Sequence, residues 1–213
     1  MSERASQQPP RSPDAGRHDN REDLARVTPG REARPRTDSA RGALPQEATA
    51  PPATAQPAVL RYEDFRIKPH NCFACGELND VGLHLKLNLE PGRCWTELQM
   101  PRRFEGWEGT IHGGILCTIL DEVMAWALVE HDNWGVTARM SIDFRKPVTV
   151  GQAIRAEGWI TESRRRIQVT AGRIVDSKTG VELAVAEATY VAASGARKRE
   201  LKERYGFSGS LAE

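Results

Sequence analysis

The sequence predicts an α+β domain, a curved antiparallel sheet of about five to six strands wrapped round one long buried helix. Three observations predict it. Short segments of alternating apolar and polar residues have the pattern of half-buried strands. One apolar run has helical length instead, and it is apolar nearly all round, so it needs covering on every side. Tight turns join consecutive strand-like segments, which favours antiparallel pairing.

Residues 1–58 cannot supply a packed core. They hold nine of the 13 prolines and no Phe, Trp, Tyr or Ile. So little apolar area cannot offset the entropy lost on ordering the segment. The segment also lacks the apolar centre of a secretory signal, and its eight acidic residues are unlike a transit peptide. We therefore expect a disordered Pro/Arg/Ala-rich tail over 1–58, a folded domain over 59–195 and a charged tail over 196–213.

The overall composition excludes several classes of protein. The formal net charge of +1 gives no electrostatic bias toward nucleic acid or an anionic membrane surface, so we expect neither as a partner. No run of about 18 uninterrupted apolar residues is present, which excludes a membrane span. Four cysteines without a secretory signal indicate reduced thiols and a cytoplasmic protein rather than a disulfide scaffold.

The strand-like segments surround the apolar run. Leucines at every second position of 83–89 predict a half-buried strand, which a Glu-Pro-Gly turn separates from a second strand near 94–100. The run IHGGILCTILDEVMAWALV (111–129) contains no proline and predicts a buried helix of about five turns. The remaining expected elements are strands over 136–145, 152–162, 166–176 and 181–193, and at most a short surface helix over 197–204.

The start of the predicted helix is a candidate oxyanion site. His112-Gly113-Gly114 places two glycines where the first helical amides are unpaired and carry partial positive charge. A ligand carbonyl could approach these amides without meeting a Cβ atom, and negative charge developing on its oxygen would be stabilised. The same residues are equally consistent with a tight turn that leads into a helix.

Asp121 is a carboxylate in the middle of the apolar run. Burying it is costly unless it is paired or lines a cavity. It follows His112 by nine residues, about 13 Å along a helix, which is too far for direct contact in one chain and favours a site shared across a dimer. Two alternatives stay open at this point: an Asp121 satisfied by hydroxyls or an arginine, and the neighbouring Glu122 as the functional acid.

Three stretches resemble the PaaI-type branch of the hotdog-fold acyl-CoA thioesterases, within the 4-hydroxybenzoyl-CoA thioesterase-like superfamily. They are CFACGELNDVGLHL (72–85), GTIHGGILCTILDEVMAWAL (109–128) and TARMSIDFRKPVTVG (137–151). The resemblance covers about residues 68–193. It implies the hotdog fold, in which the sheet wraps round the helix, and metal-free hydrolysis of an acyl thioester to acid and free thiol.

The resemblance also implies roles for individual residues. Gly113 matches the family position whose backbone amide polarises the thioester carbonyl. His112 matches the residue beside that position, which helps to place the carbonyl. Asp121 matches the catalytic acid, a general base or nucleophile. Thr137 matches a hydroxyl that orients the attacking water. Strict alternation, however, puts Thr137 on the strand face opposite Val136 and Ala138, so it would reach the site only from the strand's start.

The resemblance further implies an acyl-CoA substrate, whose phosphates need cationic or amide partners. The candidates are Gly114, Arg145, Lys146, Arg164, Arg165 and Arg166. The three consecutive arginines are also consistent with a solvated strand edge that discourages aggregation. Glu105 stands where the family usually has another polar residue before the loop glycine, which leaves the contact to the acyl end open. Three tryptophans could shape the acyl pocket or belong to the core: Trp107, Trp126 and Trp134.

We expect no metal and no cofactor. Cys72 and Cys75 form a CxxC motif with His70 nearby, but this is half of a zinc site, and no second CxxC or His pair follows. The thiols are interpreted as small apolar packing groups.

The protein as a whole is interpreted as an acyl-CoA thioesterase that forms a homodimer or a dimer of dimers. The rival hypotheses are a non-catalytic acyl-CoA-binding module and a hotdog dehydratase or hydratase.

Overall fold

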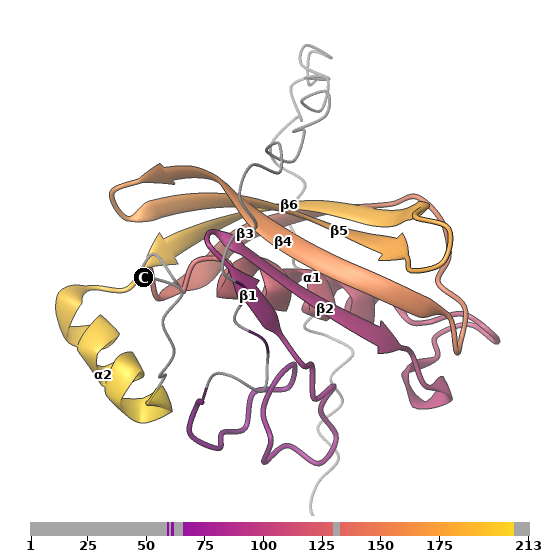
Figure 1. Ribbon diagram of the computed structural model, residues 1–213, viewed down its shortest axis with the longest axis horizontal. Helices are drawn as coiled ribbons and strands as arrows, with labels where there is room; N and C mark the ends of the chain where they lie inside the picture. Colours follow the sequence, from indigo (N-terminus) through magenta and orange to yellow (C-terminus); the bar gives the residue numbers. More distant parts are fainter. Residues whose placement is uncertain (1–58, 60, 62–65, 130–132, 207–213) are drawn as a thin grey trace, which may run out of the picture. The chain divides into compact units, whose positions relative to one another are not determined.

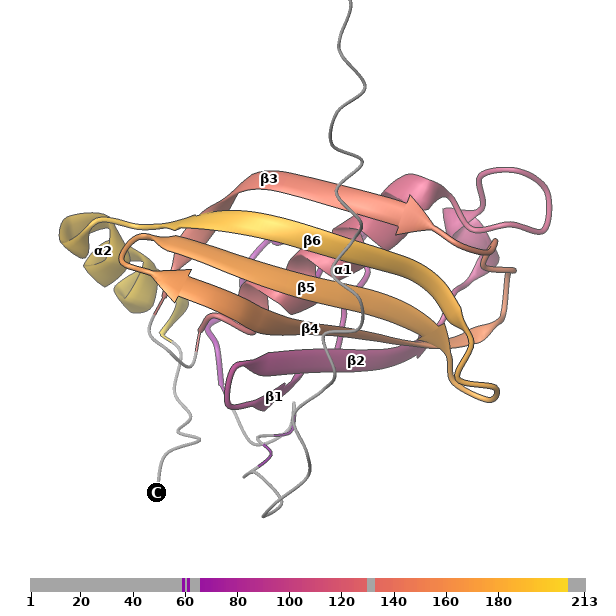
Figure 2. The same cartoon turned by 90° about the horizontal axis from the view of Figure 1, so that it is seen from above.

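The computed structural model describes residues 59, 61, 66–129 and 133–206, and the tail predicted over 1–58 lies outside this part. A six-stranded antiparallel sheet in the order β1-β2-β4-β5-β6-β3 curves around one helix, α1 (Figures 1 and 2). This confirms the predicted fold. The elements are β1 (Asn88–Glu90), β2 (Arg93–Gln99), η1 (Arg102–Phe104), α1 (Gly113–Trp126), β3 (Gly135–Phe144), β4 (Ala153–Arg164), β5 (Ile167–Asp176), β6 (Glu182–Ala192) and α2 (Gly195–Tyr205).

Neither helix of the described residues is long and apolar enough to cross a membrane.

Helix α1 lies close against the middle of the sheet because two glycines face it. Gly158 of β4 and Gly172 of β5 are register partners, so they form one smooth spot across neighbouring strands. A Cβ atom on Gly158 would lie 2.7 Å from the backbone of Met124. The helix buries five apolar side chains in this contact: Leu116, Ile119, Leu120, Val123 and Met124.

The leucine-rich segment 83–89 is a strand only at its end, so the prediction of a full strand is wrong. His84 has a positive φ of 51°, which interrupts extended structure. The amides of Leu83 and Leu85 donate instead to the carbonyls of Phe73 and Ala74, at 2.8 and 2.9 Å. The segment is thereby tied to the loop that carries Cys72 and Cys75, while its leucines still pack into the core.

Strand β3 contains a bulge that reverses the predicted phase of its first residues. The register with β6 shifts between Thr137 and Arg139, so that Thr137 lies opposite Tyr190 and Met140 lies opposite Ala188. Thr137 therefore shares the helix-facing side with Met140, and Val136 is 69% exposed. The expectation that Thr137 faces away from the buried side is wrong, because one extra residue in a strand inverts its alternation.

Helix α2 confirms the short surface helix predicted near the C-terminus and extends it to 195–205. It ends at Gly206, whose φ of 55° is the left-handed conformation common after a helix. Its last turn is attached to the loop before β1: the Lys68 amide donates to the Tyr205 carbonyl at 2.6 Å. The Tyr205 ring also packs edge-on against His70, with 5.1 Å between ring centroids.

The outer face of the sheet carries one buried acid among arginines. Glu157 is 2% exposed and accepts hydrogen bonds from Arg93 and Arg173, with Arg155 also within 3.7 Å. Burial opposes ionisation of Glu157, but the hydrogen bonds from Arg173 and Arg93 outweigh it and lower the pKa of the carboxyl. This ion cluster joins β2, β4 and β5 on the side away from the helix.

Candidate active site

The Asp121 carboxylate is held by hydroxyl groups from two strands. Thr137 Oγ1 donates to Asp121 Oδ1 at 2.7 Å, and the Tyr190 hydroxyl donates to the same oxygen at 2.9 Å. The Tyr190 hydroxyl also lies 3.0 Å from the Asp121 backbone carbonyl. The other carboxylate oxygen, Oδ2, accepts no hydrogen bond from the residues that the structure describes, so it is available to a water molecule or a substrate.

Tyr190 is a part of this arrangement that the sequence analysis missed. It comes from β6 and is 1% exposed. Burial, followed by the charge of Asp121, raises the pKa of its phenol, which keeps the hydroxyl protonated as a donor. A signal was present in the sequence: Tyr190 shares the period-two face of Ala186 and Ala188, whose small side chains leave room for a large neighbour beside the helix.

Glu122 points to different surroundings from those of Asp121, although the two are neighbours in the chain. Its Oε1 accepts a hydrogen bond from the Trp126 indole at 2.8 Å, and its Oε2 lies 3.8 Å from Cys72 Sγ. Burial, together with the nearby Cys72 sulfur, raises the pKa of the Glu122 carboxyl to about 7. The hydroxyls of Thr137 and Tyr190 thus contact Asp121, and Glu122 faces the cysteines.

At the start of α1, His112 caps the helix. Its Nδ1 accepts a hydrogen bond from the Gly114 amide at 2.9 Å, so that amide, a predicted partner for CoA, is already engaged. The Gly113 amide is the first of the helix and has no intrahelical partner. Space beside Gly113 is bounded by Phe144, whose ring carbon would lie 3.4 Å from an added Cβ. The amide at this helix start that has no intrahelical partner and is not engaged by His112 is therefore that of Gly113.

The loop before α1 is fixed by Glu105. Its carboxylate accepts a hydrogen bond from the Gly109 amide and pairs with Arg102 at 3.3 Å. Gly106 lets the loop approach the helix start, because a Cβ there would lie 3.0 Å from the His112 Cα. At the tip of the loop, Trp107 is 88% exposed. Glu105 thus stabilises the loop that presents the helix start.

The other two tryptophans considered for an acyl pocket have partners elsewhere. The Trp126 indole donates to Glu122, and the Trp134 ring stacks on Tyr205 with 6.2 Å between centroids. Among the three, only Trp107 lies on the loop that leads to the helix start. These positions make Trp107 the tryptophan best placed to meet a ligand there.

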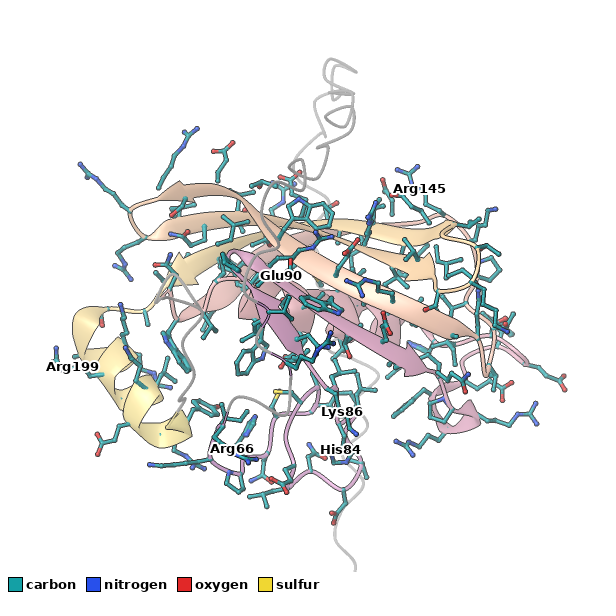
Figure 3. All side chains as sticks on the ribbon, in the orientation of Figure 1. Arg66, His84, Lys86, Glu90, Arg145 and Arg199 are labelled. Atoms are coloured by element: carbon teal, nitrogen blue, oxygen red, sulfur yellow. The ribbon has the colours of Figure 1, made fainter. Side chains whose placement is uncertain are left out.

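The predicted phosphate-binding cations lie at opposite ends of the sheet, so the structure does not gather them into one site of one chain. Arg145 and Lys146 follow β3 at the end shown by Arg145 in Figure 3. The run 164–166 lies at the other end of β4, about 36 Å away for a strand of 12 residues. Of this run, the Arg164 guanidinium pairs with Glu162 at 2.9 Å, and the Arg166 guanidinium donates to the Ala192 carbonyl.

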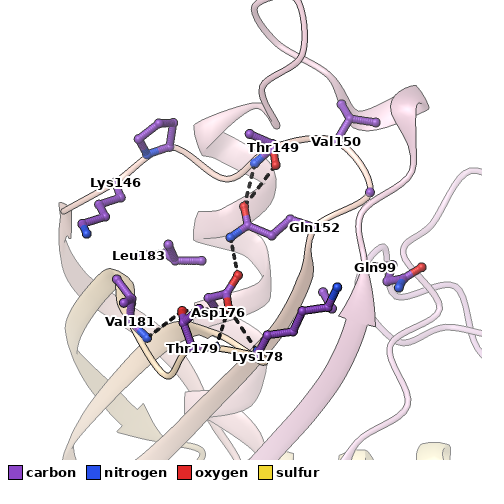
Figure 4. A pocket seen from close by; sticks show the side chains of 13 residues that line it. Gln99, Lys146, Thr149, Val150, Gln152, Asp176, Lys178, Thr179, Val181 and Leu183 are labelled. Carbon is purple, nitrogen blue, oxygen red and sulfur yellow. Dashed lines mark hydrogen bonds between the residues drawn. The ribbon is translucent and has the colours of Figure 1, made fainter.

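A shallow groove of about 670 Å³ lies beside Lys146 (Figure 4). Gln152 crosses it, accepting from the Thr149 amide at 2.9 Å and donating to Asp176 at 2.7 Å. The hydrogen bond from Gln152 lowers the pKa of the Asp176 carboxyl to about 2, and Thr179 adds to this effect. The groove is close to the start of α1 because a β-bridge joins Thr110 to Thr149.

Residues 108–183 match the family model described as the thioesterase superfamily. This segment spans the start of α1, Asp121 and the bulged strand. Over this segment, which is 76 of the 213 residues, the chain is similar to the thioesterase superfamily. Human acyl-coenzyme A thioesterase 13 is 25% identical over 96 residues, which are 44% of this chain and 69% of that protein.

Two solved structures show the same fold as this chain. The Escherichia coli PaaI protein from the phenylacetic acid degradation operon superposes with a TM-score of 0.50 at 18% identity, covering 53% of this chain and 82% of that one. A thioesterase superfamily protein superposes with a TM-score of 0.52 at 23% identity, covering 57% of this chain. The match spans only 60% of that second protein's length.

Proposed function

We propose that this chain hydrolyses an acyl-CoA, or a related acyl thioester, to a free acid and a thiol. The observation that carries the proposal is the Asp121 carboxylate, with one oxygen fixed by Thr137 and Tyr190 and the other open. The thioesterase-family match and the acyl-CoA thioesterase relative support the substrate class.

In this proposal each group has a separate task. The Gly113 amide, at the positive end of the α1 dipole, polarises the thioester carbonyl and stabilises the oxyanion that forms on it. The open Asp121 oxygen takes a proton from the attacking water or attacks the carbonyl itself. Thr137 and Tyr190 hold the carboxylate in one orientation, and the Thr137 oxygen can also accept a hydrogen bond from the water.

A complete site on this scheme contains residues of two subunits. Gly113 and Asp121 are eight residues apart on one straight helix, about 12 Å, so they cannot reach the same carbonyl. In the described sheet, the outer edge of β3 has no neighbouring strand. Antiparallel pairing of two β3 edges brings the start of one α1 toward the middle of the other. We therefore propose a homodimer or a dimer of such dimers.

The same pairing brings the two distant cation groups together. Antiparallel β3 strands exchange ends, so Arg145 and Lys146 of one subunit approach the 164–166 run of its partner. A CoA phosphate chain could then contact both groups, although each is isolated in a single chain. The groove beside Lys146 opens at this end of the sheet.

The test is a thiol-release assay over short, medium, long and aryl CoA esters. We expect release from at least one class, and loss of at least about 100-fold in kcat for Asp121→Asn, which keeps the volume and removes the base. Asp80→Asn, on the exposed loop before β1, is the matched control and should keep its activity. Esters that bind to the wild type without thiol release would identify a non-catalytic binding module instead.

A further inference from the structure

Four metal-ligating side chains meet between α1 and the loop before β1, outside the proposed catalytic groups. The reactive atoms of Cys72, Cys75 and Glu122 all lie within 4.8 Å of one another. His70 Nε2 lies 3.4 Å from Cys75 Sγ, which adds a fourth atom to the cluster. The proposed hydrolysis uses none of these groups.

Two of the distances within this cluster are close to those of a tetrahedral metal site. For zinc bonds of about 2.0–2.3 Å, tetrahedral angles separate sulfur from nitrogen or oxygen by about 3.5 Å. His70 Nε2 to Cys75 Sγ measures 3.4 Å, and Cys72 Sγ to Glu122 Oε2 measures 3.8 Å. Cys72, Cys75 and Glu122 already converge, and four-coordinate geometry requires the His70 imidazole, which is close to Cys75, to move toward the other two ligands.

The neighbours of His70 and Glu122 orient them as ligands. His70 is 4% exposed, and its Nδ1 lies 3.1 Å from the Lys68 carbonyl. A carbonyl can only accept, so Nδ1 carries the proton and Nε2 presents its lone pair to the cluster. The Trp126 indole likewise occupies Oε1 of Glu122 and leaves Oε2 toward Cys72.

The loop is folded tightly around the two cysteines. The Gly76 amide donates to the Cys72 carbonyl at 2.9 Å, and the Leu78 amide donates to the His70 carbonyl at 3.1 Å. Gly76 is required for this turn, since a Cβ there would lie 2.4 Å from the Cys72 amide nitrogen. The backbone is therefore shaped to direct both sulfurs toward α1, whichever group occupies the space between them.

We propose that His70, Cys72, Cys75 and Glu122 bind one thiophilic divalent cation of the zinc class. The second half of the site consists of His70, just before the CxxC motif, and Glu122 from α1. The proposal departs from the expectation that the chain binds no metal. Binding releases the thiol protons, and two thiolates, one carboxylate and one neutral imidazole leave the complex with one net negative charge. Four protein ligands fill the coordination shell, so the cation is structural.

The bound cation would fasten the loop 66–85 to α1 next to Asp121. It would also steady the end of α2, whose Tyr205 ring packs on His70. Metal binding should therefore raise the melting temperature of the domain, because the cation binds the folded chain and the unfolded chain does not hold its ligands together.

Cobalt is the direct probe, since thiolate-bound Co²⁺ absorbs visibly. The full chain is reduced, stripped with a chelator and titrated with Co²⁺ without oxygen. We expect saturation at one cobalt per chain, thiolate-to-metal charge-transfer absorption and the d–d bands of tetrahedral coordination. Zn²⁺ should bleach these bands and raise the melting temperature. The proposal is independent of hydrolysis, because this readout needs no substrate.

Variants identify the ligands. Cys75→Ser should abolish the charge-transfer band or weaken binding by at least about tenfold, and Glu122→Gln should weaken it by about tenfold or more. Cys117→Ser, on α1 outside the cluster, is the matched control and should bind as the wild type does. Far-ultraviolet circular dichroism checks the folding of each variant. If a variant does not fold, the cobalt titration of the wild type still tests the proposal.

Three outcomes would overturn the proposal. One is reduced wild-type protein that binds no cobalt or zinc. Another is cobalt binding that Cys75→Ser and Glu122→Gln leave unchanged. The third is a chain that takes up no metal when reduced and forms a Cys72–Cys75 disulfide in air, which would make the motif a redox pair instead.

Discussion

One oxygen of Asp121 accepts both of its hydroxyl hydrogen bonds, so the carboxylate is held asymmetrically. An acid with two equivalent, solvated oxygens could rotate freely. Here Thr137 and Tyr190 fix Oδ1, which determines where Oδ2 lies. The orientation of the proposed catalytic oxygen therefore depends on a phenol from a strand that is distant in sequence.

Tyr190→Phe tests this dependence. It removes one hydrogen bond to a charged group, worth about 1.5–3 kcal/mol, so kcat should fall by about 10- to 100-fold. The KM should change little, because Tyr190 is a positioning residue that does not contact the CoA ester. Tyr205→Phe is the matched control and should keep its kcat. A Tyr190→Phe variant with unchanged kcat would show that Thr137 alone orients the acid.

Among the elements, α1 and the sheet meet at a glycine pair. The height of the helix above the sheet is set by Gly158 and Gly172, and that height places Asp121 within reach of the Tyr190 hydroxyl.

Gly158→Ala should therefore destabilise the domain by about 1–3 kcal/mol, because the added methyl overlaps the Met124 backbone, which cannot rotate away. Gly195→Ala is the control: its nearest neighbour would lie 3.8 Å away, so the free energy of unfolding should be nearly unchanged. Urea titration measures both. Equal stability of the two variants would mean that the helix shifts without cost.

The ion cluster on the outer face predicts a pH dependence. The pKa of Glu157 is lowered in the folded state from its ordinary value of 4.5, so the folded chain binds its proton less readily than the unfolded chain. Its contribution to stability is complete above the unfolded pKa and is lost as the pH falls through the folded pKa.

Glu157→Gln should lower the free energy of unfolding by about 1–3 kcal/mol at neutral pH, and the difference from wild type should shrink in acid. Glu187→Gln, on the exposed side of β6, should behave as the wild type at every pH. Unfolding curves of the wild type and both variants from pH 7 to pH 3 would measure these differences in the free energy of unfolding. A difference that grew toward acid pH would contradict the sign of the shift.

The helix and five of the six strands could be predicted because each follows from local periodicity, whereas β1 occupies only the end of the segment predicted for it. Periodicity fails where a single residue changes the phase. The bulge after Thr137 and the positive φ of His84 leave no signature in the spacing of apolar residues. Contacts between distant segments were missed for a related reason: nothing in the spacing of Cys75 indicates that α1 lies beside it, and the small residues around Tyr190 indicate space beside the helix but not which helix residue occupies it.

At the scale of the whole molecule, the proposed site needs two chains. Mixing two inactive variants tests this. One carries Asp121→Asn, and the other carries Gly113→Leu, which blocks the approach of the carbonyl. Half of the dimers formed by random exchange are hybrids, each with one intact site of two, so activity should recover to about a quarter of wild type.

Mass spectrometry of the intact dimers confirms the exchange, and each variant mixed with itself is the control. Exchange without any recovery of activity would place both groups in the site of one subunit, and the dimer would then have no catalytic role.

The bulge in β3 also decides what can join the open edge of the sheet. An unbroken strand presents a regular row of amides and carbonyls to any extended chain, which invites indiscriminate aggregation. The displaced residue between Thr137 and Arg139 interrupts that row and bends the strand, so that regular pairing can extend only along 139–144. Arg139 and Asp143 place opposite charges along this remaining stretch. In the proposed dimer, a short, bent and charged edge would restrict the registers in which the partner strand can pair.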